Sequence, residues 1–127
     1  MKKCMIFVLL FCLLISSVGA FAAVNADLEF ASASITLTSG KLAVYSASLY
    51  DEKESVQIVA ADLYKKINGD WEYVCSLPVP SHVQTNTHSY GASISYASYI
   101  GTGTYRVTAT FSADGYEITR NSNERTF

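Results

Sequence analysis

Cysteine is scarce in this chain, and its scarcity excludes a large class of small secreted proteins. Of the three cysteines, Cys4 and Cys12 lie in an apolar leader, and only Cys75 follows it. Once the leader is removed, no disulfide can form within one chain, so a disulfide-stapled scaffold is excluded. Cys75 is then either a small buried side chain, the ordinary role of a free cysteine, or a thiol that pairs between chains.

A hydrophobic run long enough to span a membrane is also missing. The main apolar stretch, Met5 to Ile15, follows two lysines and ends in small residues. It is too short for a transmembrane helix, and no second run follows it. The small-x-small sequence Ala20-Phe21-Ala22 predicts a signal peptide over residues 1–22, with cleavage after Ala22 or, as the alternative, after Ala20. We therefore expect a secreted, extracellular domain over residues 23–127 without a membrane span.

Positive charge is in short supply as well. Loss of the leader with its two lysines leaves seven basic against eleven acidic residues, a net charge near −4. Nucleic acid and anionic membrane surfaces both require a basic footprint, so the sequence argues against either as the main partner. The remaining 105 residues are enough for one domain with its own core.

No catalytic or metal-binding pattern rises above background. His82 and His88 are the two histidines, and no carboxylate lies near them in sequence, whereas a transition-metal site needs three or four ligands. A Gly-x-Ser-x-Gly elbow is absent. Cys75 alternates in phase with Trp71, Tyr73 and Leu77 on one face of a predicted strand, which favours a core position over a reactive one. The acids of residues 51–54 lack the spacing of a calcium loop. We expect no enzyme activity and no cofactor.

The sequence does contain regular alternation of apolar and polar residues, the period of a strand with one buried face. The clearest case is Tyr105 to Phe111, in which Tyr105, Val107, Ala109 and Phe111 point one way. We expect strands over residues 34–38, 41–50, 56–66, 71–77, 89–96, 105–111 and 116–120, the last with an alternative end at residue 127. Residues 51–54 are expected to form a charged turn, and Val59, Ala61 and Leu63 to form an inner face.

Two dipeptides predict tight hairpins between these strands. Asn68-Gly69 and Asp114-Gly115 each lie between apolar flanks, and their residues accept the positive φ of a type I′ turn. Pro78 and Pro80 end the strand that follows the first hairpin, because proline has no N–H to donate. Seven short strands with turns every 8 to 14 residues predict an all-β, antiparallel sandwich.

The segment Gly103-Thr104-Tyr105-Arg106-Val107-Thr108-Ala109 resembles the penultimate strand of fibronectin type III and related immunoglobulin-like modules. The two hairpins and Trp71 add to this resemblance. More closely, the chain is similar to small, uncharacterised secreted β-sandwich proteins of Gram-positive bacteria, which carry a lysine-rich hairpin ending in tryptophan and a late Gly-Thr-Tyr-Arg-Val strand. The resemblance implies an immunoglobulin-like sandwich of about seven strands and a tyrosine corner, but no activity.

Aromatic residues supply the remaining candidates. The sequence holds nine tyrosines and one tryptophan. We expect structural roles for Tyr105 and Trp71 inside the core, together with Tyr45, and a backbone hydrogen bond for the Tyr105 hydroxyl. The remaining candidates cannot all be buried: Tyr90, Tyr96, Tyr99 and Tyr116. Tyrosine suits contact with protein or glycan, although sheets favour it in any case. Two or more of the four should therefore be exposed and close together.

These patterns predict a secreted, non-enzymatic interaction module whose ligand is an unknown protein or glycan. Its contact region is expected at residues 80–90 or 96–102. A second hypothesis is a small secreted antagonist, such as a bacteriocin-like toxin or a peptidase inhibitor. Size and secretion permit that role, but the sequence contains neither a double-glycine leader nor a disulfide scaffold.

Overall fold

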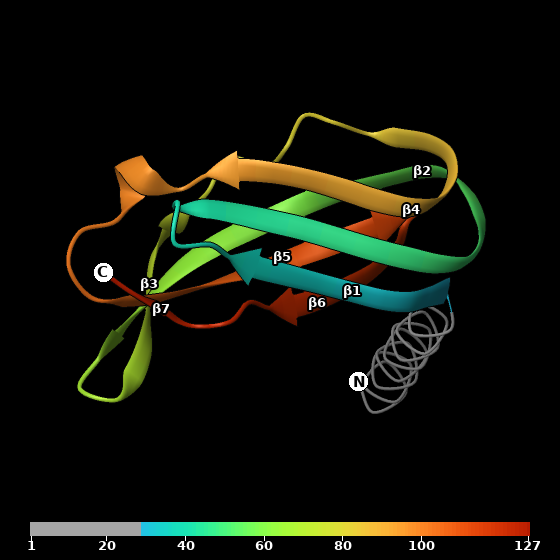
Figure 1. The fold of residues 1–127 in the computed structure, drawn as a ribbon. Helices are drawn as coiled ribbons and strands as arrows, with labels where there is room; N and C mark the ends of the chain where they lie inside the picture. Colours follow the sequence, from blue (N-terminus) through green and yellow to red (C-terminus); the bar gives the residue numbers. More distant parts are fainter. Residues whose placement is uncertain (1–28) are drawn as a thin grey trace, which may run out of the picture.

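The computed structural model describes residues 29–127, so the signal peptide predicted over residues 1–22 lies outside it. The described chain forms one antiparallel sheet of seven strands, which confirms the predicted all-β class. The strands are β1 Phe30–Leu37, β2 Leu42–Ile67, β3 Asp70–Ser76, β4 Gln84–Ser95, β5 Thr104–Ala113, β6 Tyr116–Asn121 and β7 Arg125–Thr126, with one 3-10 turn, η1 Ala97–Tyr99 (Figure 1). Residues 29–127 include no helix long and apolar enough to cross a membrane.

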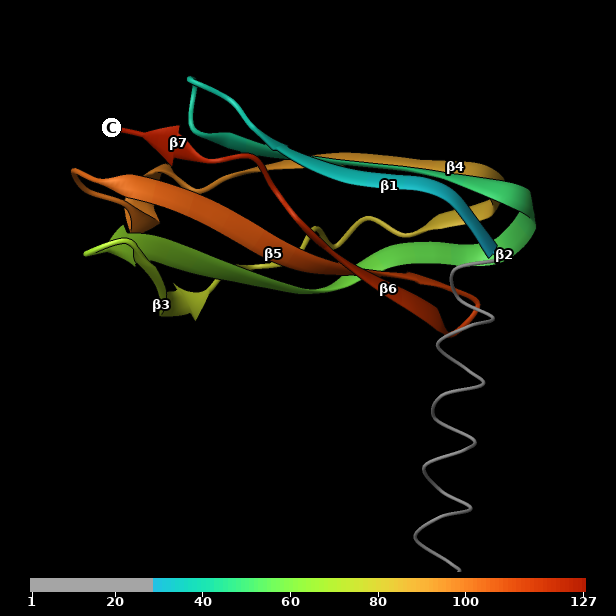
Figure 2. The same cartoon turned by 90° about the horizontal axis from the view of Figure 1, so that it is seen from below.

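Strand β2 is the element around which the others are arranged. It is 26 residues long and pairs with four other strands. Its first part, residues 42–49, pairs with β1 and β4, and its last part, residues 56–67, pairs with β5 and β3. In Figure 2, β1, the first part of β2 and β4 lie along one side of the molecule, and the rest of β2 lies with β3, β5 and β6 along the other. The sheet therefore folds over itself where β2 bends.

The charged run at residues 51–54 is part of β2, so the predicted turn there is wrong. The strand continues because its backbone and side chains find partners far away in sequence. The Asp114 carboxylate accepts hydrogen bonds from the N–H of Glu54 at 3.2 Å and of Ser55 at 2.9 Å. The Lys53 ammonium pairs with the Glu29 carboxylate. β4 pairs alongside and therefore begins at Gln84, before residue 89, where the sequence predicted this strand to start.

A β-bulge in β2 changes which residues face the interior. Ala61 and Leu63 are buried as predicted, but Val59 is 41% exposed, so its placement on the inner face is wrong. The register with β5 shifts between Ile58 and Ala60, which leaves Val59 as the extra residue. One extra residue reverses the alternation of side chains, so Val56 and Ile58 continue the inner face instead.

The core lies between the two halves of the folded sheet. β5 supplies its centre: Tyr105, Val107, Ala109 and Phe111 are buried, as the alternation predicted. The Phe111 ring meets the Tyr45 ring edge-on, with centroids 6.4 Å apart. Tyr45 is fully buried, and its hydroxyl has no hydrogen-bond partner among the described residues. Burial raises the pKa of Tyr45 to about 12, and the neighbouring Tyr90 hydroxyl adds to the increase.

Both predicted hairpin turns are confirmed by the backbone angles. Asn68 and Gly69 have φ of 52° and 86°, and Asp114 and Gly115 have φ of 49° and 86°. Positive φ at two successive positions gives the tight turn a twist that matches the flanking strands. The first turn joins β2 to β3, and the second joins β5 to β6.

The C-terminal segment ties the two halves of the sheet together. The Asn123 side chain accepts a hydrogen bond from the Leu37 N–H at 2.7 Å and donates one to the Leu37 carbonyl at 3.2 Å. Arg125 Nε donates to the same carbonyl at 3.0 Å. Gly103 and Phe127 exchange two backbone hydrogen bonds. The end of β1 is thereby linked to the segment that leads into β5.

Candidate functional site

Four tyrosines were predicted to form the contact surface, and the structure does not gather them. Tyr90 and Tyr96 are buried, 3% and 0% exposed, so a surface role for these two is wrong. Backbone carbonyls accept from their hydroxyls: His82 from Tyr90 at 3.2 Å, and Thr38 from Tyr96 at 3.3 Å. Tyr116 is half-buried at the start of β6, whereas Tyr99 is exposed in η1, at the opposite end of the view in Figure 1.

Tyr105 has the surroundings that the sequence predicted for it. Its ring is 3% exposed, and its hydroxyl accepts a hydrogen bond from the Gly101 N–H at 3.0 Å. The bond joins the start of β5 to the bend four residues upstream. The Lys65 ammonium lies 5.7 Å from the ring centroid, and the Lys65 side chain also packs against Gly103. Tyr105 therefore holds the entry to β5 in place.

A second bulge, between β2 and β3, places aromatic side chains on the outer surface. Leu63 is opposite Cys75, but Tyr64 is opposite Tyr73, so Val74 is the extra residue. The sequence predicted Trp71, Tyr73, Cys75 and Leu77 on one face, and this is wrong because the bulge divides them. Cys75 and Leu77 pack against the core. Trp71 is half-buried and lies outside the core cluster, so its predicted place inside the core is wrong. Tyr73 is 59% exposed and also lies outside the cluster.

Four side chains from three adjacent strands form what we call the aromatic face: Tyr64, Trp71, Tyr73 and Arg106. Tyr64 is opposite both Tyr73 on β3 and Arg106 on β5, which places these three side by side across the sheet. Arg106 Cζ lies 4.5 Å from the Trp71 ring centroid and 5.8 Å from that of Tyr64. The Tyr64 and Tyr73 rings meet edge-on with centroids 6.0 Å apart. These are the distances of cation–π and edge-to-face contacts.

Polar groups border the aromatic face. Ser76 Oγ donates to Asp62 Oδ1 at 2.8 Å and lies 3.0 Å from the Tyr73 hydroxyl. Because the single Ser76 proton is directed at Asp62, Tyr73 must be the donor in the second bond. The result is a chain of three polar groups that ends in a carboxylate. It holds the most exposed ring of the face by its hydroxyl.

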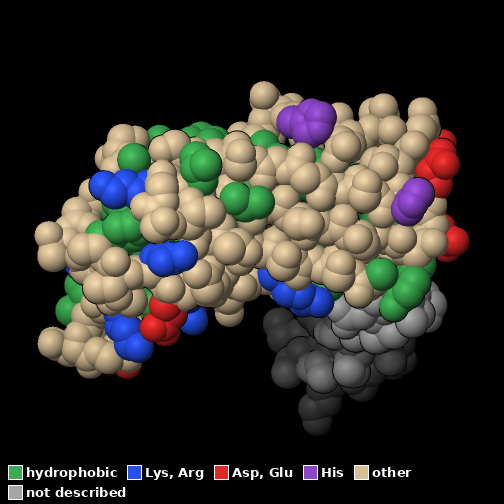
Figure 3. Space-filling model, viewed as in Figure 1, with side chains coloured by type: hydrophobic (Ala, Val, Ile, Leu, Met, Phe, Trp, Pro, Cys, Tyr) green, Lys and Arg blue, Asp and Glu red, His purple; other side chains and the backbone are tan. Residues whose placement is uncertain are grey.

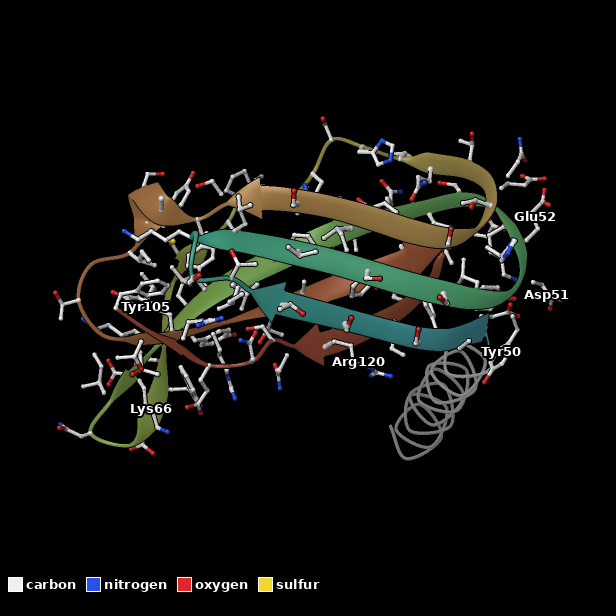
Figure 4. All side chains as sticks on the ribbon, viewed as in Figure 1. Tyr50, Asp51, Glu52, Lys66, Tyr105 and Arg120 are labelled. Atoms are coloured by element: carbon white, nitrogen blue, oxygen red, sulfur yellow. The ribbon has the colours of Figure 1, made fainter. Side chains whose placement is uncertain are left out.

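The cations of this region differ in their partners. The Lys66 ammonium lies 5.6 Å from the Trp71 centroid and 3.5 Å from a Glu124 carboxylate oxygen. Arg106 Nε is buried and has no hydrogen-bond partner among residues 29–127. Figure 4 shows Lys66 beside the β2–β3 hairpin, at the opposite end of the molecule from Tyr50, Asp51 and Glu52. The aromatic face is therefore far from the acidic bend of β2.

The other outer surface, formed by β1, the first part of β2 and β4, has a different composition, and we call it the serine face. Its residues lie opposite one another across the three strands: Ser32, Ser48 and Ser89; Ser34, Ser46 and Gly91; Thr36, Val44 and Ser93. None of these side chains is charged. In Figure 3 the middle of this surface is mainly tan, the colour of the backbone and of side chains that are neither hydrophobic nor charged, with a few hydrophobic side chains between.

A shallow groove of about 430 Å³ lies beside β4. It is lined by residues 79–82 and by Ala92, Ser93 and Ile94. One of the two histidines, His82, contributes to its wall, but Cys75 does not, so the groove does not join a thiol to a histidine. Within residues 29–127, no three His, Cys, Asp or Glu side chains lie close enough to hold a metal ion. The groove is therefore a concave surface whose lining residues do not form a catalytic or metal-binding set.

Comparison with protein-family models and with curated proteins finds no match to this sequence. The case for the aromatic face as a site therefore rests on the contacts among its own residues. The sequence signal that could have located it is the aromatic residue on each side of the Asn-Gly hairpin, Tyr64 and Trp71. What the sequence did not show is the bulge that turns Tyr73 outward to join them.

Proposed function

We propose that this chain is a secreted, non-enzymatic β-sandwich of the immunoglobulin-like type that binds a glycan through the aromatic face. The observation that carries the proposal is the row of Trp71, Tyr64 and Tyr73 on three neighbouring positions of a rigid sheet, with Arg106 packed among them. Sites built on strands hold their side chains more firmly than sites built on loops.

Strand pairing supports the immunoglobulin-like fold. In constant-type domains, strands A, B, E and D form one sheet, and C, F and G form the other. If the two parts of β2 are taken as B and C, then β1, β4, β5 and β6 correspond to A, E, F and G. The neighbours are then A–B–E and C–F–G, as paired here, with β3 added beside C. The Tyr105 bond to Gly101 lies between E and F, where a tyrosine corner belongs.

The chemistry of the aromatic face favours a sugar ring as ligand. The C–H side of a sugar is apolar and packs on an aromatic ring, whereas its hydroxyls need donors and acceptors at the border. Trp71 and Tyr73 supply the rings, and Asp62, Ser76 and Tyr73 supply the polar chain. An extended, open face suits a glycan chain better than an enclosed small molecule. Secretion, which the leader predicts, would bring the domain into contact with extracellular glycans.

A binding assay with the mature chain tests this proposal. Residues 23–127 are titrated by calorimetry against a panel of neutral and acidic oligosaccharides. We expect Trp71→Ala and Tyr73→Ala each to weaken binding about tenfold, equivalent to about 1.4 kcal/mol. Tyr50→Ala is the matched control, because Tyr50 is 67% exposed and lies at the opposite end of the molecule from the hairpin (Figure 4).

Two results would contradict glycan binding by this face. One is a loss of affinity in Tyr50→Ala equal to that in Trp71→Ala. The other is the absence of binding to every saccharide, together with specific retention of a protein from the cell surface, which would make the ligand a protein. The antagonist hypothesis stays a prediction, and a growth-inhibition assay with the purified mature chain tests it.

A further inference from the structure

Arg106 is the cation at the centre of the aromatic face, and its guanidinium has no acceptor there. A guanidinium carries five N–H donors and no acceptor. Arg106 donates no hydrogen bond to a group within residues 29–127, and its Nε is both buried and unpaired. Its contacts are instead with two rings, Trp71 at 4.5 Å and Tyr64 at 5.8 Å from Cζ.

Two charged neighbours of Arg106, Lys66 and Asp62, already have partners. Lys66 lies 3.5 Å from a Glu124 carboxylate oxygen, and Asp62 accepts a hydrogen bond from Ser76 at 2.8 Å. The remaining arginines also donate: Arg120 to the Thr119 carbonyl at 3.1 Å, and Arg125 to the Leu37 carbonyl at 3.0 Å. Within the described chain, Arg106 is thus the arginine whose charge is met neither by a carboxylate nor by a carbonyl.

We infer that the aromatic face selects an anionic saccharide, whose acidic group pairs with the Arg106 guanidinium while its ring packs on Trp71 and Tyr73. This inference rests on the proposed glycan-binding function and adds the charge of the ligand to it. The planar guanidinium presents two parallel N–H groups, which match the paired oxygens of a carboxylate or a sulfate. The shared chemistry is therefore a sugar ring bearing an oxyanion with two accessible oxygens.

The position of Arg106 places that anion beside the stacking ring. Because its guanidinium already contacts Trp71, an anion held by its N–H groups lies at the edge of that ring. The sugar that carries the anion then extends over the ring or toward Tyr73. The pair would also be partly shielded from water, since Arg106 is half-buried, and shielding strengthens a charge-assisted hydrogen bond.

Matched ligand pairs test the inference on the unmodified mature chain. Oligogalacturonate is compared with its methyl ester, and sulfated dextran oligosaccharide with the unsulfated form. The two pairs distinguish a carboxylate from a sulfate, because each removes one kind of anion from an unchanged sugar backbone. We expect at least one acidic form to bind about tenfold or more tightly than its neutral counterpart, and this preference to weaken with added salt.

Substitutions of Arg106 test whether this residue causes the preference for the acidic saccharide. Arg106→Gln should reduce the affinity for the acidic form to that for the neutral form and leave the neutral form's affinity within about twofold. Arg106→Lys keeps the charge but loses the planar pair of donors, so most of the preference should disappear. Arg120→Gln is the control, since it removes an exposed arginine outside the aromatic face. Thermal unfolding and Trp71 fluorescence check that each variant is folded.

The possible failures are distinguishable. Equal binding of the acidic and neutral forms overturns the inference and leaves glycan binding in place, and so does binding confined to neutral sugars of the wider panel. An equal loss of both affinities in Arg106→Gln shows that Arg106 only supports the rings, which also overturns the inference. If no saccharide binds the wild-type chain, both this inference and the proposed function fail. The wild-type comparison stands even if a variant does not fold.

Discussion

The aromatic face and the serine face share strand β2 but differ in the residues that they expose. The first part of β2 contributes Ser46 and Ser48 to the serine face, and the last part contributes Tyr64 to the aromatic face. Their inner sides are alike, because both halves of β2 bury aliphatic and aromatic side chains in one core. Packing of the core constrains the inner positions, whereas the outer positions are free to differ. The rings and the cation of the aromatic face lie outside that core.

The largest expected effect comes from the interior that both faces share. Phe111 is fully buried and its ring meets those of Tyr45 and Phe30. Phe111→Ala should lower the free energy of unfolding by about 3–5 kcal/mol, because it leaves a cavity between the two halves of the sheet. Denaturant unfolding measures the loss. A loss of less than about 1 kcal/mol would mean that the core is not where the two halves are joined.

The next largest effect is expected from a substitution that removes hydrogen bonds between the two halves of the sheet without creating a cavity. Asn123→Ala removes both hydrogen bonds to Leu37, at the end of β1, and leaves its N–H without a side-chain partner. We expect a loss of about 1–2 kcal/mol in the free energy of unfolding, and earlier hydrogen exchange at β1 than at β5. Asn121→Ala is the matched control, because the Asn121 side chain accepts a hydrogen bond from Thr108 within the same half. Equal losses of unfolding free energy in the two variants would contradict the claim that the C-terminal segment links the two halves.

Two buried tyrosines provide a smaller, paired comparison. The Tyr105 hydroxyl accepts from Gly101, whereas the Tyr45 hydroxyl has no described partner. Tyr105→Phe should cost about 1 kcal/mol, and Tyr45→Phe should leave stability unchanged or raise it by up to about 1 kcal/mol. Denaturant unfolding of both variants measures the difference. A larger loss of stability in Tyr45→Phe than in Tyr105→Phe would contradict a tyrosine corner at Tyr105 and weaken the comparison with immunoglobulin-like domains.

The same pair predicts a dependence on pH. Burial raises the pKa of Tyr45 from its ordinary value of 10.0 to about 12, so the folded state keeps the hydroxyl proton to a higher pH than the unfolded state does. The contribution of Tyr45 is therefore fully present below about pH 10 and is lost as the pH rises toward about 12. Tyr45→Phe should show a smaller fall in unfolding free energy between about pH 8 and pH 11 than the wild type. Identical falls would mean that folding does not raise the pKa of Tyr45.

The smallest expected effect is on the serine face. Ser46→Ala changes an exposed residue at the middle of that face. Stability should change by less than about 0.5 kcal/mol, and saccharide affinity should not change at all. Calorimetric titration and denaturant unfolding measure the two quantities. A clear loss of saccharide binding would place the ligand on the serine face and reverse the comparison of the two surfaces.

Local patterns predicted much of this fold. The alternation of β5, both positive-φ hairpins, and the burial and hydrogen bond of Tyr105 follow from residues close together in sequence. The continuity of β2 through residues 51–54 does not, because it depends on Asp114, 60 positions from Glu54. A charged tetrapeptide is typical of a turn until such a partner is known.

The candidate site was harder to predict, for a related reason. Strand alternation places Trp71, Tyr73, Cys75 and Leu77 on one side, and a single bulged residue, Val74, separates the first two from the last two. Bulges leave no clear mark in the sequence, yet each one exchanges the inner and outer faces. Tyr90 and Tyr96 were misplaced because backbone carbonyls of His82 and Thr38 satisfy their hydroxyls, which makes burial favourable.

The most direct measurement is the saccharide affinity of three variants that differ only in where a side chain is removed. Trp71→Ala alters the aromatic face, Ser46→Ala the serine face, and Tyr50→Ala an exposed tyrosine outside both. We expect an affinity loss of about tenfold in the first and none in the other two. Equal affinities for all three variants, in chains that remain folded, would contradict the claim that the aromatic face is the binding surface.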